Sequence, residues 1–196
     1  EKKIELDKIA QEINSFKNLD IAKNAAHAVP GEGNPDAEIL CIGEAPGALE
    51  DTTGRPFVGQ SGQLMRKTFV EIGIDPADIF ITNIVKFRPP DNRDPTPEEI
   101  EACKNWLDRQ ISIIQPKIIV TLGRFSMAKF IPGVTISQVH GIARYCQLST
   151  VNYQLIVFPM YHLAAALRGT TMLNAFKEDF LKLKNLLAPQ VKIEDN

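Results

Sequence analysis

The sequence has few cysteines, no long apolar run and no excess of positive charge. Its cysteines, Cys41, Cys103 and Cys146, are scattered and odd in number, which argues against a secreted domain held together by disulfides. No apolar segment approaches the roughly 20 residues that cross a bilayer, so we expect no membrane attachment. The first residues, EKKIELDKIAQEINSF, mix acidic and basic side chains in a helical pattern unlike that of a signal peptide. We therefore expect a cytoplasmic protein.

The overall charge gives no support for nonspecific binding to nucleic acid. The net charge is −2 and the pI is about 6.0, whereas a protein that binds nucleic acid nonspecifically is usually basic. A DNA- or RNA-binding role would therefore need a local basic face. The chain has 196 residues, of which 44% are hydrophobic, and this is enough for one compact domain with a sizeable core. We expect a single domain over residues 1–196.

Hydrophobic periodicity predicts helices that alternate with strands along the chain. Ile4, Ile9, Ile13 and Phe16 recur at near-helical spacing, and they predict a helix over residues 3–17 that packs on the domain. Further helices are predicted over residues 62–73, 96–114 and 171–187, the second of which is capped by Thr96 in the sequence TPEE. Strands are predicted over residues 38–44, 78–87, 116–123 and 153–160, and residues 134–148 fit short strands.

This alternation, with strands that are almost continuously apolar, indicates a parallel sheet covered on both faces. We therefore predict an α/β protein, a three-layer α/β/α sandwich with a central four-stranded, mostly parallel sheet. In such sheets, ligands bind beyond the carboxyl ends of the strands. The segments that leave the four strands at that edge carry a polar set of residues, namely Glu44, Glu50, Asn83, Arg88, Ser126, His162 and Arg168.

The loop IGEAPGALEDTTGRPFVGQSG, residues 42–62, combines carboxylates, several glycines and a single aromatic residue, Phe57. An aromatic ring can stack on a base, and the amide of Asn83 can match the Watson–Crick edge of a pyrimidine. His162 can donate a hydrogen bond to a developing anion, and a carboxylate can orient water or stabilise a cationic sugar. Together these groups suit cleavage of a base–sugar bond on a base flipped out of the helix.

Taken singly, the same residues fit ordinary structural roles. Glu44 and Glu50 fit solvated loop carboxylates, Phe57 fits a core position, and a buried Asn83 must find hydrogen-bond partners whether or not it binds a ligand. A lone histidine after a strand, such as His162, is also more often structural. It is the joint placement of these groups at one edge of the sheet that favours a functional site.

Three segments resemble the family 4 uracil-DNA glycosylases: GEAPGALEDTTGRPFVGQSG, ITNIVKFRPPDNRDPTPEEIEAC and YHLAAALRG, with GEGNPDAEILCIGEAPG extending the match upstream. The resemblance covers residues 16–187. It implies the uracil-DNA glycosylase fold and hydrolytic removal of uracil from DNA, which starts base-excision repair. A monofunctional enzyme is expected, because no lysine nucleophile is evident in the motifs. The expected partner is uracil-containing DNA, bound by a monomer near the nucleoid.

The resemblance also implies roles for individual residues. Phe57 would stack on the flipped-out uracil, Asn83 would read its edge, and His162 would face uracil O2. Glu50 is favoured over Glu44 for the water or the sugar cation, and Ala45 takes the place of an aspartate found in another family of uracil glycosylases. The remaining expected contacts are Gly43 at the base, and Gly59, Ser61, Arg88, Ser126, Leu167 and Arg168 along the DNA. The local basic face would comprise Lys86, Arg88, Arg93, Arg124 and Arg168.

The chain departs from the family 4 pattern at the cysteines that hold a [4Fe–4S] cluster. Phe16 and Leu19 stand at two ligand positions, Cys103 matches the third, and no cysteine lies near the fourth, in PKIIVTLG. Because a cluster needs close to four thiolates, we predict neither a cluster nor another metal. Phe16 and Leu19 would pack hydrophobically, and Cys103 would be an unpaired buried thiol. Leu163 also follows the motif histidine, where proline is usual.

Three alternatives to an enzyme for uracil alone remain. The same fold could have a broader base choice and excise hypoxanthine or xanthine as well, although Asn83 and Phe57 favour uracil first. The chain could be a non-catalytic nucleic-acid-binding module, but binding alone would not need Glu50, Asn83 and His162 together. It could act on free nucleotides, with the Gly-rich loop around a phosphate, but it lacks the phosphate-binding patterns GxxxxGK[ST] and GxGxxG.

Overall fold

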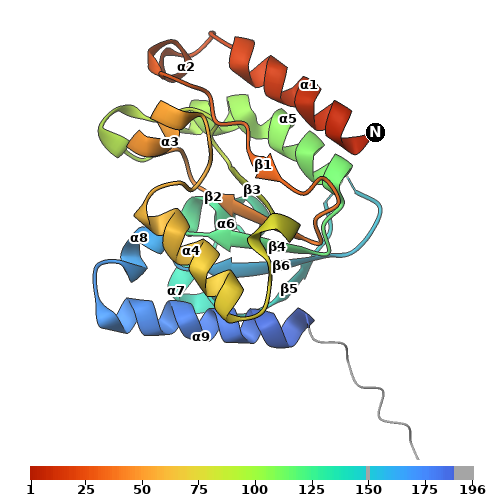
Figure 1. Ribbon diagram of the computed structural model, residues 1–196, viewed down its shortest axis with the longest axis vertical. Helices are drawn as coiled ribbons and strands as arrows, with labels where there is room; N and C mark the ends of the chain where they lie inside the picture. Colours follow the sequence, from red (N-terminus) through yellow and green to blue (C-terminus); the bar gives the residue numbers. More distant parts are fainter. Residues whose placement is uncertain (149–150, 188–196) are drawn as a thin grey trace, which may run out of the picture.

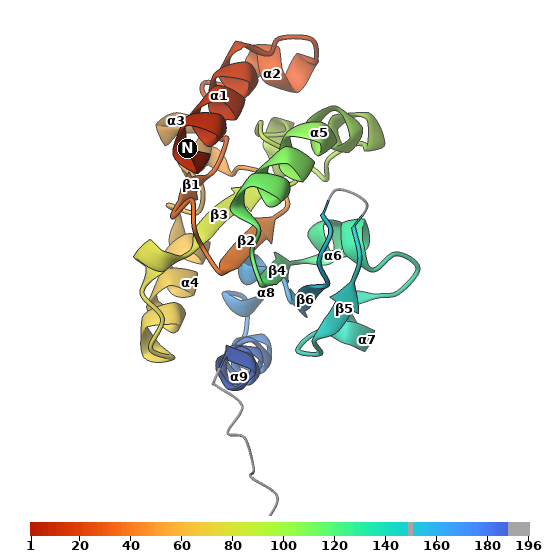
Figure 2. The same cartoon turned by 90° about the vertical axis from the view of Figure 1, so that its right-hand side faces the viewer.

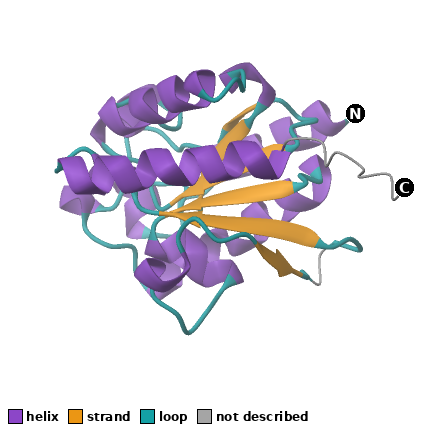
Figure 3. Cartoon of the chain, turned by 90° about the horizontal axis from the view of Figure 1, so that it is seen from below, coloured by secondary structure: helices purple, strands orange, loops and turns teal. Residues whose placement is uncertain are grey.

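A six-stranded sheet runs through the centre of the protein, and helices cover both of its faces (Figure 1 and Figure 3). The computed structural model describes residues 1–148 and 151–187, so residues 149–150 and 188–196 of the predicted domain lie outside the described residues. Four parallel strands form the middle of the sheet: β2 (Ile39–Gly43), β3 (Phe80–Asn83), β4 (Ile118–Leu122) and β6 (Leu155–Met160). The predicted α/β sandwich with a mostly parallel sheet is confirmed.

The predicted count of four strands is wrong, because two short strands add to the edges of the sheet. β1 (Glu32–Gly33) pairs antiparallel with β3, and β5 (Arg144–Cys146) pairs antiparallel with β6. The strand order is β1-β3-β2-β4-β6-β5. Strands of two and three residues are too short for a hydrophobic alternation to be visible in the sequence.

The helices divide between the two faces of the sheet (Figure 2). One layer contains α1 (Lys2–Ser15), α5 (Pro97–Ile114) and α6 (Arg124–Phe130), whose buried residues share one hydrophobic cluster. The opposite layer contains α4 (Gln60–Glu71), α8 (Leu163–Ala166) and α9 (Thr170–Leu187), whose buried residues share a second cluster. Short helices stand in the connections: α2 (Asp20–Asn24), α3 (Ala48–Thr53), α7 (Ile136–Val139), η1 (Pro76–Asp78) and η2 (Pro90–Asn92).

Alternate residues of β2 face the two layers, as expected for a strand that is buried on both sides. Leu40 and Ile42 join the cluster with α1 and α5, whereas Ile39 and Cys41 join the cluster with α4 and α9. Cys103, on α5, belongs to the first cluster. Cys41 and Cys103 therefore lie on opposite sides of the sheet.

The N-terminal helix α1 packs against α5 (Figure 1). Ile9 and Ile13 are completely buried, and Arg109 of α5 donates two hydrogen bonds to the carboxylate of Glu12. The helix ends just before Phe16, whose backbone is extended with a ψ of 128°. This extended residue carries the chain away from α1 and allows the Phe16 ring to turn back into the core.

The other predicted elements are found with changed boundaries. α5 begins with the predicted cap, because Thr96 and Glu99 exchange side-chain and main-chain hydrogen bonds. β3 ends at Asn83, well before the end of the predicted strand 78–87, because the chain turns out of the sheet there. Residues 134–148 are only partly strand, since α7 precedes β5. Among the described residues, no helix has the length and apolarity to cross a membrane.

Candidate active site

The carboxyl ends of the parallel strands open into a cleft of about 390 Å³. Most of the residues singled out from the sequence line it, namely Glu44, Ala45, Glu50, Phe57, Ser61, Asn83, His162 and Arg168, together with Arg93 of the expected basic face. The cleft is also lined by five residues that were not predicted from the sequence, namely Pro46, Gly47, Pro89, Asn92 and Ala164. All five lie inside the motif segments, so their position beside motif residues was the available signal.

Asn83 ends β3 and presents its side-chain amide to the cleft. The residue is 2% exposed, and its Oδ1 is buried without a hydrogen-bond partner among the described residues. Leaving a buried amide oxygen unpaired is costly, so the native fold normally satisfies such groups. A ligand with an N–H group directed at Asn83 would supply the missing donor.

Gly43 allows an aromatic ring and the Asn83 amide to meet at the same point. Parallel pairing of β2 with β3 sets Gly43 opposite Asn83. A Cβ atom on Gly43 would lie 2.4 Å from Asn83 Oδ1 and 2.4 Å from Phe57 Cζ, which is closer than atoms can approach. Only glycine at this position leaves room for both side chains.

Phe57 reaches this point from a constrained main-chain conformation. Its φ of 52° lies in the left-handed region, which is uncommon for a residue with a side chain. A Cβ atom on Gly62 would lie 1.8 Å from the carbonyl oxygen of Phe57, so the first turn of α4 contacts the Phe57 backbone directly. The glycines of this loop therefore serve close packing around the ring.

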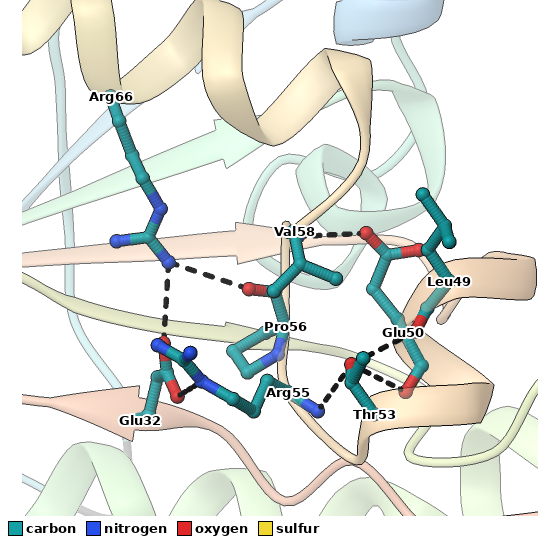
Figure 4. A network of polar contacts seen from close by, with 8 residues as sticks. All are labelled: Glu32, Leu49, Glu50, Thr53, Arg55, Pro56, Val58 and Arg66. Carbon is teal, nitrogen blue, oxygen red and sulfur yellow. Dashed lines mark hydrogen bonds and ion pairs between the residues drawn. The ribbon is translucent and has the colours of Figure 1, made fainter.

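Glu50, at the middle of α3, holds the loop that follows Phe57 (Figure 4). Its Oε1 accepts hydrogen bonds from the main-chain N–H groups of Val58 and Gly59, both at 2.9 Å. The Gly59 amide, expected to contact phosphate, is thus occupied by a carboxylate of the same chain. One oxygen of the Glu50 carboxylate therefore holds the loop in place through these two hydrogen bonds.

The opposite side of the same loop is tied to β1 and α4 (Figure 4). Glu32 accepts hydrogen bonds from Arg55 at 2.8 and 2.9 Å and from Arg66 at 3.3 Å. Arg66 also donates to the carbonyl oxygen of Pro56 at 3.4 Å. The Phe57 backbone is therefore bounded by hydrogen bonds on both sides.

Glu44 is a half-buried carboxylate directly after β2. Its side chain accepts no hydrogen bond from the described residues, in contrast to Glu50. Burial raises the pKa of Glu44 above its usual value, and the negative charge of Asp94 adds to this effect. Glu44 is accordingly a half-buried carboxylate whose oxygens are not engaged by hydrogen bonds from the described residues.

His162 begins α8, and its ring acts as the cap of that helix. The main-chain N–H of Ala164 donates to His162 Nδ1 at 3.1 Å. Desolvation by the surrounding protein, and secondarily the positive charge of Arg168, lower the pKa of His162. The neutral ring then carries its proton on Nε2, because Nδ1 is an acceptor. His162 is thus a hydrogen-bond donor on the side away from α8.

The arginines around the cleft differ in how far their charge is compensated. Arg93 forms a two-point ion pair with the buried carboxylate of Glu99, and Arg124 pairs with Asp94. Among the described residues, Arg88 donates only to the neutral side chain of Asn92, at 2.9 Å. Arg168 forms no ion pair with a described residue. Arg168, which lines the cleft, and Arg88, which contacts the cleft residue Asn92, therefore carry positive charge that no described carboxylate compensates.

Three residues expected to face DNA, Ser126, Lys86 and Leu167, are not among the residues that line the cleft. The Ser126 side chain is completely buried and donates to the carbonyl oxygen of Gly123. Lys86 is also completely buried, so its assignment to the basic face is wrong. Leu167 follows α8 and is 46% exposed, beside Arg168. Leu167 and Arg168 thus place an exposed apolar side chain and an exposed basic side chain next to each other in the chain.

Aromatic side chains pack around Phe16, which stands at one of the positions where a cluster would need a cysteine. The ring of Phe16 packs edge-on against Trp106, with centroids 5.0 Å apart, and lies 5.9 Å from Phe87. Cys103 is buried, Cys41 lies across the sheet, and no group of three potential metal ligands is found within residues 1–148 and 151–187. These residues do not fit a cluster that needs four thiolates.

Comparison with known proteins gives one consistent result. Residues 30–185 match the family model described as the uracil DNA glycosylase superfamily. A type-4 uracil-DNA glycosylase of Sulfurisphaera tokodaii is 47% identical over 186 residues, which cover 92% of this chain and 84% of the relative. Proteins of the same name from Saccharolobus solfataricus and Archaeoglobus fulgidus are 44% and 42% identical, and each match covers at least 90% of both chains.

Proposed function

The chain belongs to the uracil DNA glycosylase superfamily, and from this we propose that it hydrolyses the N-glycosidic bond of uracil in DNA. The products would be free uracil and an abasic site, which is the first step of base-excision repair. One observation carries the proposal: the Phe57 ring and the unpaired Asn83 amide meet over Gly43. A ring beside an amide is a site for one planar base with a hydrogen-bonding edge.

Uracil would enter this site after rotation out of the duplex. Phe57 would stack on the base, and Asn83 Oδ1 would accept the hydrogen bond of uracil N3–H. Extrusion costs a few kcal/mol and is easiest at a mismatch such as U·G. Leu167, exposed at the rim, is suited to fill the space that the base leaves in the duplex.

Cleavage develops negative charge on uracil and positive charge on the sugar. We propose that His162 Nε2–H donates to uracil O2 as the bond breaks, since its Nδ1 is already an acceptor. Preorganised donors of this kind stabilise developing charge effectively. The neutral ring also avoids the cost of placing a cation in a site already flanked by Arg168.

We assign the carboxylate that faces the sugar or the attacking water to Glu44. Glu50 was favoured from the sequence, but one of its oxygens is engaged by two main-chain N–H groups. Glu44 has no such engagement with the described residues and is half-buried, and burial raises its pKa. Glu50 would then act through the loop that bears Phe57, as a positioning residue.

We propose that DNA lies across the cleft with its phosphates near Arg88 and Arg168, whose charges are not compensated by a described carboxylate. Ser61, at the start of α4, also lines the cleft and is suited to a phosphate contact. We further propose that the protein acts as a monomer on DNA in the cytoplasm. Size-exclusion chromatography of the free and the DNA-bound protein tests the monomer.

We propose that catalysis needs no iron–sulfur cluster. The aromatic contacts of Phe16 with Phe87 and Trp106 support this, because Phe16 stands at one of the cysteine-ligand positions and packs there against two other rings. Purified protein should contain far less than one iron per chain and show no broad visible absorbance. Stoichiometric iron with a brown colour would contradict the proposal, and loss of activity on its removal would show a need for it.

The test of the function is cleavage of a labelled oligonucleotide that contains one uracil. U·G, U·A and single-stranded substrates are incubated with the protein and then treated with alkali. Strand breaks that require alkali would establish a monofunctional glycosylase. Absence of breaks with normal DNA binding would favour a binding module, and breaks only at hypoxanthine or xanthine would favour altered base choice.

A further inference from the structure

A completely buried lysine lies directly behind the residue proposed to read uracil. Lys86 is three residues after Asn83 and has 0% exposure. Its Nζ donates hydrogen bonds to Thr82 Oγ1 at 2.6 Å, to the main-chain carbonyl of Asn83 at 2.8 Å, and to Gln110 Oε1 at 2.8 Å. The mechanism above uses none of these contacts.

The three partners of Lys86 are fixed as acceptors. Thr82 Oγ1 donates its own proton to the carbonyl oxygen of Pro30 at 2.9 Å. Gln110 donates from Nε2 to the same oxygen at 2.8 Å, which leaves its Oε1 directed at Lys86. Three acceptors therefore face the three N–H groups of one ammonium. The arrangement links α5, β3 and the segment before β1 around a single charge.

The surroundings of Lys86 favour this charged form despite the burial. Burial lowers the pKa of Lys86 to about 7, a shift that Cys103 opposes and the neighbouring charge of Lys129 reinforces. The thiol of Cys103, on α5, is the other titratable group at this position. A neutral amine would leave one of the three acceptors without a donor. The ammonium therefore persists on the acid side of neutrality.

The contact with Asn83 is the one that bears on the cleft. No described residue donates a hydrogen bond to Asn83 Oδ1 to fix the direction of this side chain, so its direction depends on its main chain. β3 ends at this residue, and the chain turns out of the sheet. The hydrogen bond from Lys86 to the Asn83 carbonyl acts at this point, where regular strand pairing stops.

We propose that Lys86 is a positioning residue for base recognition, because its ammonium holds the Asn83 main chain and so directs the Asn83 amide into the cleft. The inference rests on the proposed glycosylase function. It predicts that Lys86 contributes to the chemical step through Asn83 and not independently of it. A lysine that merely stabilises the fold would contribute in the same way whether or not Asn83 were present.

A double-mutant cycle distinguishes these two possibilities. Single-turnover rates on a U·G duplex are measured for the wild type, Lys86→Met, Asn83→Ala and the double variant. Lys86→Met should slow the reaction by about 10- to 100-fold, the scale of a small misplacement at the site. In the Asn83→Ala background the same substitution should change the rate by less than about threefold. Equal effects in both backgrounds would overturn the proposal.

Controls separate this result from a loss of folding and from failure of the proposed function. Lys129→Met removes another largely buried lysine, one that pairs with Asp108, and should leave the rate within about twofold of the wild type. If Lys86→Met does not fold, Gln110→Met replaces it in the cycle, because it removes one acceptor and keeps the volume. An inactive wild type would instead refute the glycosylase function itself. Thermal unfolding of each variant establishes that it is folded.

Discussion

Two glutamates of the cleft, Glu44 and Glu50, differ in what their oxygens contact. This difference predicts that replacement by glutamine lowers the rate at one position and leaves it nearly unchanged at the other. Glu50→Gln keeps an acceptor oxygen for the Val58 and Gly59 amides, so the rate should stay near that of the wild type. Glu44→Gln removes a charge proposed to face the sugar and should lower the single-turnover rate by about 100- to 1,000-fold. A larger loss for Glu50→Gln than for Glu44→Gln would reverse the assignment.

The acid limb of the pH–rate profile should report on Glu44. The pKa of Glu44 is raised by burial and by Asp94, and the active form is the carboxylate, so activity falls as the pH drops through that raised pKa. Asp94→Asn removes the nearby negative charge and frees Arg124, and both changes lower the pKa of Glu44. The acid limb of kcat should therefore move to lower pH in Asp94→Asn.

The single-turnover rate constant at saturating enzyme is measured at a series of pH values under constant ionic strength. His162 contributes on the same side, because its lowered pKa keeps the ring neutral near pH 7 and protonation removes activity only at lower pH. A His162→Asn variant shows how much of the fall in rate at low pH is due to protonation of His162. An acid limb that moves upward in Asp94→Asn would contradict the role given to Glu44.

At the residue scale, the sequence predicted which residues line the cleft better than it predicted their contacts. Asn83, Phe57 and His162 were identified because motif segments leave the strands at one edge, and parallel pairing brings that edge together. The bracing role of Glu50 could not be predicted, since it depends on the turn that brings Val58 close. The burial of Lys86 was missed because a lysine in a basic motif is normally solvated.

At the scale of elements, the start of α4 packs so closely on the Phe57 loop that Gly62 has no room for a side chain. Gly62→Ala would place a Cβ atom against the Phe57 carbonyl, so the loop or the helix must shift. We expect weaker uracil excision together with a lower melting temperature, because the loop also supports packing of α4. Activity assays and thermal unfolding measured on the same sample test both effects.

Gly169→Ala provides the matched control for this prediction. A Cβ atom on Gly169 would meet nothing within 4 Å, and the residue has no positive φ. Its melting temperature should stay close to that of the wild type. An equal loss of stability in both variants would show that the close contact of Gly62 is unimportant.

The elements predicted correctly are those whose hydrophobic pattern is long enough to be recognised. α5, with the Thr96 cap, and the central strands followed from local signals. The edge strand β1 did not, because its two residues are set by pairing with β3 and not by their own pattern, and β5 falls within residues 134–148, where short strands were expected without bounds. The helix α7 was missed for the same reason, since it has only four residues.

At the scale of the whole molecule, a net charge of −2 leaves DNA binding to a few local cations. Arg168→Ala should reduce the slope of log K against log salt concentration by about 1, because one phosphate contact is lost. Arg124→Ala should change the slope much less, since Asp94 already compensates that charge. Equilibrium binding of an abasic-site duplex at several salt concentrations gives both slopes, and equal slopes for the two variants would contradict this assignment.

The left-handed backbone at Phe57 has a consequence for the thermodynamics of successive reaction cycles. The ring is already placed by Gly62, Glu50 and Arg66 in the DNA-free protein. The conformational entropy of ordering this loop is therefore lost once, when the chain folds, and not again at each encounter with DNA. Each newly flipped base meets a surface that is already shaped for it. The difference in binding free energy between two bases therefore comes from their own contacts with this surface and includes no cost of ordering the loop.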